Sequence, residues 1–322
     1  MPKEISHWYL ADLVKQNLPA ESVFKEPVTT HENLFFLGAV TPDIPFYYLV
    51  GPGSARIQAA ARPFHRSDVR ALAPVLTFFD RMGGAAADPG ALSLGAGIVC
   101  HILADTAFHP LVYYHSGQSR IHPGAAARHR QFETALDLYF RHQAGTGVRV
   151  SLHRILSETE TADHQLYGYL AALFDLNDPG DKTWLKYAIR SHAFYQAIFQ
   201  NPGVYRILTR LNKRRLWLLD LALALFYPPG QGGGLPFFDR MFQYRDPVSG
   251  RYRSDRIPDL ARQAATDSLA VLSRISDGIK AKQSLSGLAE NAGLPRVRPG
   301  ISPCRFWRRQ PDLFTELYRR KK

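Results

Sequence analysis

Apolar residues recur at spacings of three and four along most of the chain, which is the periodicity of amphipathic helices. Few runs alternate like strands, and the best of them, at 149–155, is short. Since glycine and proline clusters separate the helical stretches, the sequence predicts an all-α fold, a multi-helix bundle. The predicted helices lie at about residues 5–16, 69–82, 91–109, 124–143, 162–176, 182–199, 204–227 and 259–280.

Two prolines set the expected limits of the helix at 91–109. Asp88 stands before Pro89, a pair typical of a helix start, because aspartate caps the first turn and proline fits the first helical position. Pro110 lacks the amide hydrogen that a helix needs and is expected to end the same helix.

The composition excludes several classes of protein. Of the 322 residues, 45% are hydrophobic and 21% are charged, a balance typical of globular domains and not of disordered chains. Two cysteines, Cys100 and Cys304, are too few for a disulfide framework. The longest apolar runs, such as 216–227, are too short to span a membrane, so no transmembrane segment is predicted. No signal peptide is recognisable, and we expect a cytoplasmic protein.

The chain is strongly basic. It carries 40 lysines and arginines against 28 aspartates and glutamates, which gives a net charge of +12. This excess favours anionic partners: phosphate esters, anionic lipid surfaces or nucleic acid. Part of it lies at 305–322, where a solubilising tail is the alternative to a binding surface.

Histidines and acids four residues apart are the strongest chemical signal. His101 and Asp105 lie one turn apart in a helical context, and His129 and Glu133 repeat the spacing on the next predicted helix. His109 follows His101 by two turns, on about the same face. Imidazoles and carboxylates suit zinc, and two ligands from one helix leave room for others from neighbouring helices. The alternative is a buried hydrogen-bonded pair that organises the core.

Three further candidates precede these pairs. Asp43 follows an apolar run in a proline-bounded loop, His65 stands before a helix, and His7 begins the first helix. Each alone also fits a structural role: a turn or cap residue for Asp43, a cap for His65 and a partly buried ring for His7.

The eight candidates have a recognisable order along the chain: His7, Asp43, His65, His101, Asp105, His109, His129 and Glu133. This order resembles that of the ligands in the zinc-dependent phospholipase C family, whose all-helical fold is shared with single-strand-specific zinc nucleases. The resemblance is close over about residues 1–140 and looser at 244–264.

The resemblance implies a cluster of two or three zinc ions. One ion would bind between the early loops and the helix at 91–109, and a second between that helix and the next. The implied ligands are Asp43, His65, His101 and Asp105 for the first ion, and His109, His129 and Glu133 for the second.

A third zinc ion is implied at the start of the chain. Asp105 would bridge to it, and His7 would bind it together with the N-terminal amine and carbonyl. Secreted members of the family expose a processed N-terminus, whereas this chain begins Met1-Pro2. If Met1 is removed, Pro2 becomes the terminal ligand, and this is a hypothesis that rests on its distance from His7.

The resemblance implies hydrolysis of a phosphodiester. Paired zinc ions lower the pKa of a shared water toward neutrality, and the resulting hydroxide attacks phosphorus. Asp43 would orient that water as a base. The first hypothesis is a phospholipase C-like enzyme, whose substrate is a phospholipid. The alternatives are a single-strand nuclease and a metal-binding helical protein without turnover.

The residues around the candidate site leave the substrate open. The aromatic side chains near Asp43, from Phe35 to Tyr48, are expected to be mostly core, with an entrance for acyl chains or bases as the alternative. The apolar stretch 216–227 follows the basic residues 213–215. We expect it to be a buried core helix, with peripheral contact to an anionic membrane as the alternative.

The expected organisation has three parts. Residues 1–227 form a catalytic helical domain with the metal cluster, 237–290 a C-terminal helical part packed on the same domain, and 291–322 a basic, flexible tail. The glycine-rich stretch 228–236 is either a linker or a loop within one domain. A phospholipase of this kind would lie in the cytoplasm, peripheral at the inner membrane face.

Overall fold

Helices make up most of the described part of the chain, where the sheet is a single pair of short strands. The computed structural model describes residues 4–83, 88–118, 122, 124–145, 151–162, 165–214, 216–229, 236–290, 297–301 and 304–308. The predicted all-α fold is confirmed.

The elements follow in the order in which they are numbered. The α-helices are α1 (Glu4–Asn17), α2 (Lys25–Thr30), α3 (Glu32–Gly38), α4 (Ser54–Ala61), α5 (Ala73–Arg81), α6 (Pro89–Ser116), α7 (Ala125–Ala144), α8 (Leu152–Ala162), α9 (Leu166–Leu173), α10 (Asp181–Phe199), α11 (Pro202–Leu211), α12 (Trp217–Leu223) and α13 (Ile257–Lys280). The 3-10 helices are η1 (Thr41–Tyr47), η2 (Arg62–His65), η3 (Val69–Leu72), η5 (Asn212–Arg214), η6 (Pro236–Asp239) and η7 (Ser286–Glu290). The strands β1 (Phe242–Arg245) and β2 (Tyr252–Asp255) pair in antiparallel fashion.

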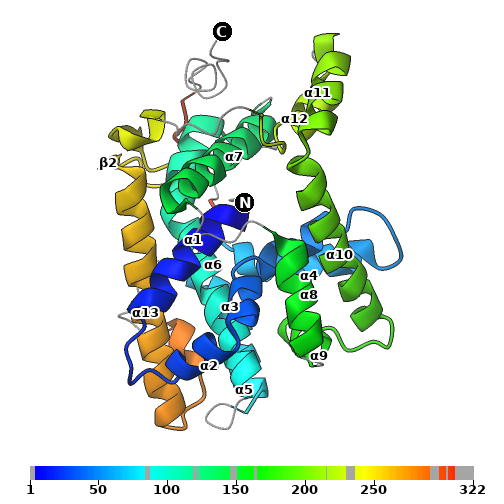
Figure 1. Cartoon of the computed structure of the whole chain (residues 1–322). Coiled ribbons are helices and arrows are strands. Elements are labelled where there is room, and N and C mark those ends of the chain that lie inside the picture. Colours follow the sequence, from blue (N-terminus) through cyan, green and yellow to red (C-terminus); the bar gives the residue numbers. More distant parts are fainter. Residues whose placement is uncertain are drawn as a thin grey trace.

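The long helix α6 passes through the centre of the molecule, and α1, α3, α7 and α13 pack against it (Figure 1). In this view α13 stands on one side and α10 on the other, with α4, α8 and α9 in contact with α10. α11 projects beyond the end of α10 at the upper right. The two helices that carry the four-residue pairs, α6 and α7, are therefore direct neighbours.

Burial explains the apolar composition of α6. The side chain of Asp88 accepts hydrogen bonds from the backbone amides of Gly90 (2.8 Å) and Ala91 (3.4 Å), so the predicted capped start is present. By length and composition alone α6 could cross a membrane, but 94% of its most apolar window is buried inside the protein. We therefore interpret α6 as a core helix.

The predicted end of this helix at Pro110 is wrong. α6 continues through Pro110 to Ser116. A proline inside a helix costs about 3 kcal/mol, because it removes one backbone hydrogen bond and crowds the preceding turn. The surrounding Phe108, Leu111 and Val112 are buried, so the packing of this turn outweighs the local penalty.

Two glycines allow α3 and α6 to cross in close contact. A Cβ atom on Gly97 would lie 2.0 Å from the carbonyl oxygen of Phe35, and one on Gly38 would lie 2.1 Å from that of Leu94. Neither position accepts a larger residue unless a helix backbone moves. The close crossing matters for the site because it brings the residue after α3, Ala39, against a histidine of α6.

Two stretches fold differently from the sequence prediction. In the run 149–155, α8 begins at Leu152, and residues 146–150 lie outside the described part. The stretch 204–227 forms α11, η5 and a separate α12. Asn212 causes this break, because its side-chain amide donates to Asp220 (2.5 Å) while its side-chain oxygen accepts from the backbone amide of Leu216 (2.8 Å).

The region after the candidate linker packs on the rest of the protein. α13 contacts α1 and α6. Part of the expected tail also makes backbone hydrogen bonds, from Gly300 to Arg66 (3.0 Å) and from Arg308 to Tyr114 (2.9 Å). Residues 297–301 and 304–308 are thus packed against helices, whereas 230–235 and 309–322 lie outside the described residues. The division into domains stays a prediction.

Substitution Gly97→Ala should destabilise the protein by about 1–3 kcal/mol, because the new methyl group forces the α3–α6 crossing apart. The matched control is Gly168→Ala on α9, where nothing lies within 4 Å of the added atom. This control should raise the free energy of unfolding by up to about 1 kcal/mol, because alanine favours the helix. Chemical denaturation measures both changes, and equal stabilities for the two variants would contradict the close crossing.

Candidate metal centre

The eight side chains singled out in the sequence converge around the middle of α6. The four-residue spacings on α6 and α7 place each pair on one helix face. The side chains are His7 from α1, Asp43 from η1, His65 from η2, His101, Asp105 and His109 from α6, and His129 and Glu133 from α7.

Asp105 joins three of the histidines. Its Oδ1 is 3.7 Å from Nε2 of His7 and 3.5 Å from Nε2 of His109, and its Oδ2 is 3.6 Å from Nε2 of His101. Tetrahedral zinc with ligands at about 2.0–2.2 Å holds those ligand atoms roughly 3.3–3.6 Å apart. The spacing around Asp105 is thus close to that of ligands around a shared ion.

A second group lies on the side of η1 and η2. Nε2 of His65 is 2.9 Å from Oδ1 of Asp43, and Nε2 of His101 is 3.7 Å from the same oxygen. His101 therefore belongs to two groups at once, which makes them continuous.

The third group lies between α6 and α7. Oε1 of Glu133 is 2.6 Å from Nε2 of His129 and 3.8 Å from Nε2 of His109. Because His109 also faces Asp105, this group adjoins the first one. The structure thus brings all eight predicted residues into one place.

Backbone carbonyl groups orient two of the rings. Nδ1 of His101 donates to the carbonyl oxygen of Ala39 at 3.0 Å, and Nδ1 of His109 donates to that of Pro299. Because a carbonyl oxygen only accepts, each Nδ1 carries the hydrogen and each Nε2 keeps its lone pair. Such outer hydrogen bonds orient metal-binding histidines.

His7 is positioned by a carboxylate that the sequence analysis does not single out. Asp137 on α7 is buried and accepts hydrogen bonds from the backbone amides of Ile5 (3.1 Å) and Ser6 (2.8 Å). Since these amides form the positive end of the helix dipole, the carboxylate fixes the start of α1. The one sequence signal for Asp137 is its place one turn after a predicted ligand on the same helix.

Burial keeps the imidazoles neutral. Removal from water lowers the pKa of His7 and His65 to about 3, that of His129 to about 4, and that of His101 well below its usual value. These rings are therefore uncharged near neutral pH, which is the form that binds a metal.

Burial has the opposite effect on two carboxylates. It raises the pKa of Asp105 to about 6, and together with the nearby charge of Asp105 it raises the pKa of Asp43 well above its usual value. For Glu133, burial favours the neutral acid, but the ring of His129 holds the pKa well below its usual value. The neutral rings of His7, His65 and His101 supply no full positive charge to Asp43 and Asp105.

Zinc fits this set of residues. In the part of the chain that the structure describes, both oxygens of Asp105, Nε2 of His101 and of His109, and both ring nitrogens of His7 are buried without a hydrogen-bond partner. Each such atom costs roughly 1–3 kcal/mol. A divalent cation would satisfy several of them together, and imidazole with carboxylate is a donor set that zinc prefers.

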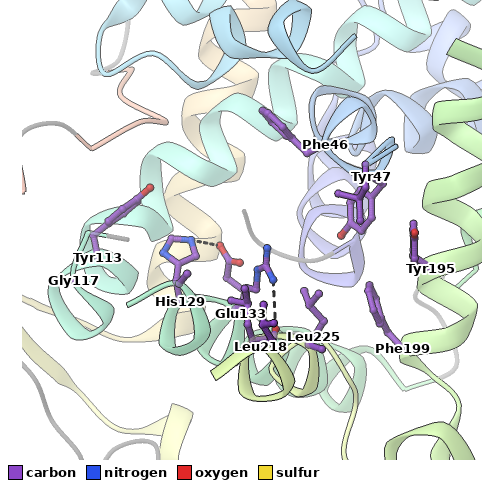
Figure 2. Close-up of a pocket in the computed structure, with 15 residues that line it drawn as sticks. Phe46, Tyr47, Tyr113, Gly117, His129, Glu133, Tyr195, Phe199, Leu218 and Leu225 are labelled. Atoms are coloured by element: carbon purple, nitrogen blue, oxygen red, sulfur yellow. Dashed lines mark hydrogen bonds and ion pairs between the residues drawn. The ribbon is translucent and has the colours of Figure 1, made fainter. Parts of the chain in front are cut away.

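An apolar cavity of about 520 Å³ opens beside the third group. Figure 2 shows His129 and Glu133 on one wall, with Tyr47, Tyr195 and Phe199 facing them. Leucines of the α12 region, including those at 218 and 225, line it from below in this view. The cavity therefore has a polar end at the candidate metal centre and a larger apolar part.

A second hollow, of about 400 Å³, adjoins the same residue, Tyr113. Tyr113 lines both spaces, and His65 lines this one. The guanidinium groups of Arg62 and Arg66 also line it, and Arg66 pairs with Asp68 at 3.5 Å. The candidate metal centre is thus reached from an apolar and from a basic side.

Several residues outside the eight have clear places. Phe35 and Phe36 are core residues, as expected for the aromatic side chains near Asp43, whereas Phe46 and Tyr47 line the cavity. His192 is not singled out in the sequence analysis. Its Nε2 lies 2.7 Å from Oε1 of Glu4, and its ring stacks on that of Tyr47. It thereby supports one cavity wall. Residues 1–3, which include the predicted terminal ligand Pro2, lie outside the described residues.

Comparison with known proteins identifies the family. A family model described as zinc dependent phospholipase C matches residues 6–194, more than half of the chain. The chain therefore belongs to the zinc-dependent phospholipase C family, and its membership supports a zinc-dependent hydrolase of phosphodiesters. No curated protein and no solved structure matches the chain.

Substitution His129→Ala should lower the zinc content of the purified protein by about one ion per chain, because the third group loses a ligand. The matched control is His142→Ala, which removes an exposed histidine from the same helix. Elemental analysis of both variants measures the difference. Equal zinc content in the two variants would overturn the assignment of His129 as a ligand.

After chelation of the metal, stability should fall as the pH drops below about 6.5. The buried His7, His65 and His129 stay neutral in the fold down to about pH 3–4, whereas the unfolded chain binds protons there from 6.5 downward. Because the unfolded state then holds more protons, the free energy of unfolding decreases in acid. The raised pKa values of Asp43 and Asp105 oppose this loss of stability, because the fold binds protons at these two groups more readily than the unfolded chain does. The three histidines outnumber them.

Calorimetry of the chelated protein at about pH 7.5 and pH 5 measures this effect, with the unfolding temperature expected to be lower at pH 5. Higher stability of the chelated protein at pH 5 would show that the rings are not held neutral in the fold.

Proposed function

We propose that the protein is a phospholipase C-like enzyme that hydrolyses the phosphodiester bond of a phospholipid with the help of zinc. Family membership supports the reaction class. The choice of a lipid is carried by one observation, the apolar cavity beside His129 and Glu133. Leucines and aromatic rings around a space of this size suit acyl chains.

The described side chains divide into three ligand groups. Zinc bound here would lower the pKa of a water molecule and withdraw charge from the phosphate oxygens. Asp43, His65, His101 and Asp105 would hold one ion, and His109, His129 and Glu133 would hold another. His7, with Asp105 beside it, would contribute to a third.

Asp43 would orient the attacking water and accept its proton at the carboxylate. His65 holds Oδ1 of Asp43 at 2.9 Å and fixes the direction of this side chain. Tyr113 stands edge-on to His109 and His129, with ring centroids 5.4 and 4.8 Å apart. Its ring covers one side of the third group and limits access of bulk water.

We place the headgroup in the basic hollow beside His65. A lipid in the apolar cavity would present its phosphate to the metal centre, which leaves the second hollow, also lined by Tyr113 and His65, for the headgroup. Arg62 and Arg66 there would attract the phosphorylated headgroup that the reaction releases, because guanidinium groups bind phosphate well.

A single-strand nuclease is the second candidate. The net charge of +12 favours nucleic acid, and the rings of Tyr47 and Tyr195 in the cavity could stack on bases. The cavity is nevertheless mainly apolar, and base stacking needs no leucine-lined space. A location in the cytoplasm, peripheral at the inner membrane face, stays a prediction from the sequence.

The test is hydrolysis of a panel that contains a long-chain phospholipid, single-stranded DNA and RNA, and a small chromogenic phosphodiester. We expect release of diacylglycerol from the lipid, with kcat/KM lowered by about two orders of magnitude or more in His101→Ala. Cleavage of nucleic acid alone would favour the nuclease. Full zinc content without turnover of any substrate would favour a metal-binding protein.

The variant Ala222→Trp separates the two enzymatic alternatives further. Ala222 lines the apolar cavity, so an indole there would occupy space assigned to acyl chains. We expect roughly tenfold lower kcat/KM on the long-chain lipid, with the small diester unaffected. An unchanged rate on the long-chain lipid would place the acyl chains elsewhere.

A further inference from the structure

Large apolar side chains are exposed around the outer end of the cavity. Leu218 at the start of α12 is 59% exposed and Leu49 after η1 is 60% exposed, and both line the cavity. Further large exposed apolar residues adjoin Leu218 along the chain and lie on α11, which contacts α12. Together these residues form the apolar rim: Leu49, Val50, Ile207, Leu211, Leu216, Trp217 and Leu218.

The rim is not part of the protein core. Trp217 is 71% exposed and Val50 is 86% exposed. On α11, Val204 and Leu208 pack on the core, whereas Ile207 points outward. The expectation that 216–227 begins as a buried core helix is therefore wrong for its first residues. Large apolar side chains exposed in neighbouring segments mark a place of contact with a partner or a membrane.

Basic side chains lie within the same segment. Arg206 and Arg210 on α11 and Lys213 on η5 are exposed. Asp220 of the same segment is engaged by Asn212. The exposed charge beside the rim is thus positive, and it is complementary to an anionic lipid surface. A tryptophan next to leucines and arginines is typical of segments at the membrane interface.

The rim and the cavity are continuous. Leu49 and Leu218 belong to both, while His129 and Glu133 stand at the inner end of the cavity. A lipid that enters the cavity from the rim could therefore keep its acyl chains in contact with apolar side chains along the whole path. An association of two copies through the rim would instead close the mouth of the cavity.

We propose that the apolar rim seats the protein on an anionic phospholipid surface, with α11 and the start of α12 inserted among the lipids and the cavity open toward them. The role of the apolar rim in bringing the enzyme to its substrate rests on the proposed phospholipase function. Binding of the protein to a phospholipid surface does not require hydrolysis. Binding to vesicles and hydrolysis can therefore be measured separately.

The experiment is sedimentation of the full chain with vesicles of phosphatidylcholine alone or with about 30% phosphatidylglycerol. The wild-type protein should bind the mixed vesicles. The variant Leu216→Ser/Trp217→Ser should bind them about tenfold or more weakly, because it removes two large inserting side chains. Substitution Arg206→Glu/Arg210→Glu should weaken binding to the mixed vesicles by roughly fivefold or more per charge.

The matched control is Met241→Ser/Tyr252→Ser. These residues are also large, apolar and exposed, but they lie at the β1–β2 hairpin, on the opposite side of Figure 1 from α11. This control should bind vesicles like the wild type. Circular dichroism verifies that all variants are folded, and hydrolysis of the small chromogenic diester should be the same in the rim variants and the wild type.

The outcomes decide between the two proposals. No binding of the wild type, or equal loss in the rim and control variants, would overturn the membrane surface. A dimer in light scattering that Leu216→Ser/Trp217→Ser dissociates, without vesicle binding, would assign the rim to a second copy. Vesicle binding that depends on the rim, without hydrolysis of any phosphodiester, would keep the membrane surface and reject the phospholipase.

Discussion

The burial of the Asp105 carboxylate among neutral imidazoles is the constraint on which the rest of the structure depends. Two other acids, Asp43 and Glu133, are buried beside it, and the pKa values of His7, His65 and His101 are too low for these rings to carry charge. Both oxygens of Asp105 and the Nε2 atoms that face them have no hydrogen-bond partner among the described residues, and this costs free energy unless a cation binds them. The centre therefore fits divalent cations better than it fits a purely structural core network.

The helices around this centre serve to hold its ligands in fixed directions. The glycine crossing of α3 and α6 lets the carbonyl of Ala39 reach the ring of His101. The buried Asp137 draws the first turn of α1 against α7 and thereby carries His7 to the cluster. Ligands that are oriented before the ion arrives lose little conformational freedom when it binds.

The sequence predicts the helical class and the eight converging side chains, because both depend on local spacing and on order along the chain. The pairs on α6 and α7 are visible as four-residue intervals, and the upstream residues are meaningful only through their order. The carbonyl of Pro299 and the amides held by Asp137 could not be predicted, since contacts with the backbone of a distant segment leave no mark in residue type.

Tertiary packing explains the places where local rules fail. Pro110 stays inside a helix because its neighbours are buried, and no local rule contains that information. The break between α11 and α12 depends on the side chain of Asn212, which binds at both ends of one turn. Amphipathicity identifies an apolar face, but it does not tell whether that face meets the core or the surroundings.

The hydrogen bond between His109 and the carbonyl of Pro299 connects the centre to a residue far along the chain. His7 enters the same centre from the opposite direction of the sequence. During translation, the carbonyl group that orients His109 becomes available only after residue 299 has left the ribosome. Shorter nascent chains contain all eight candidate ligands but lack this orienting contact.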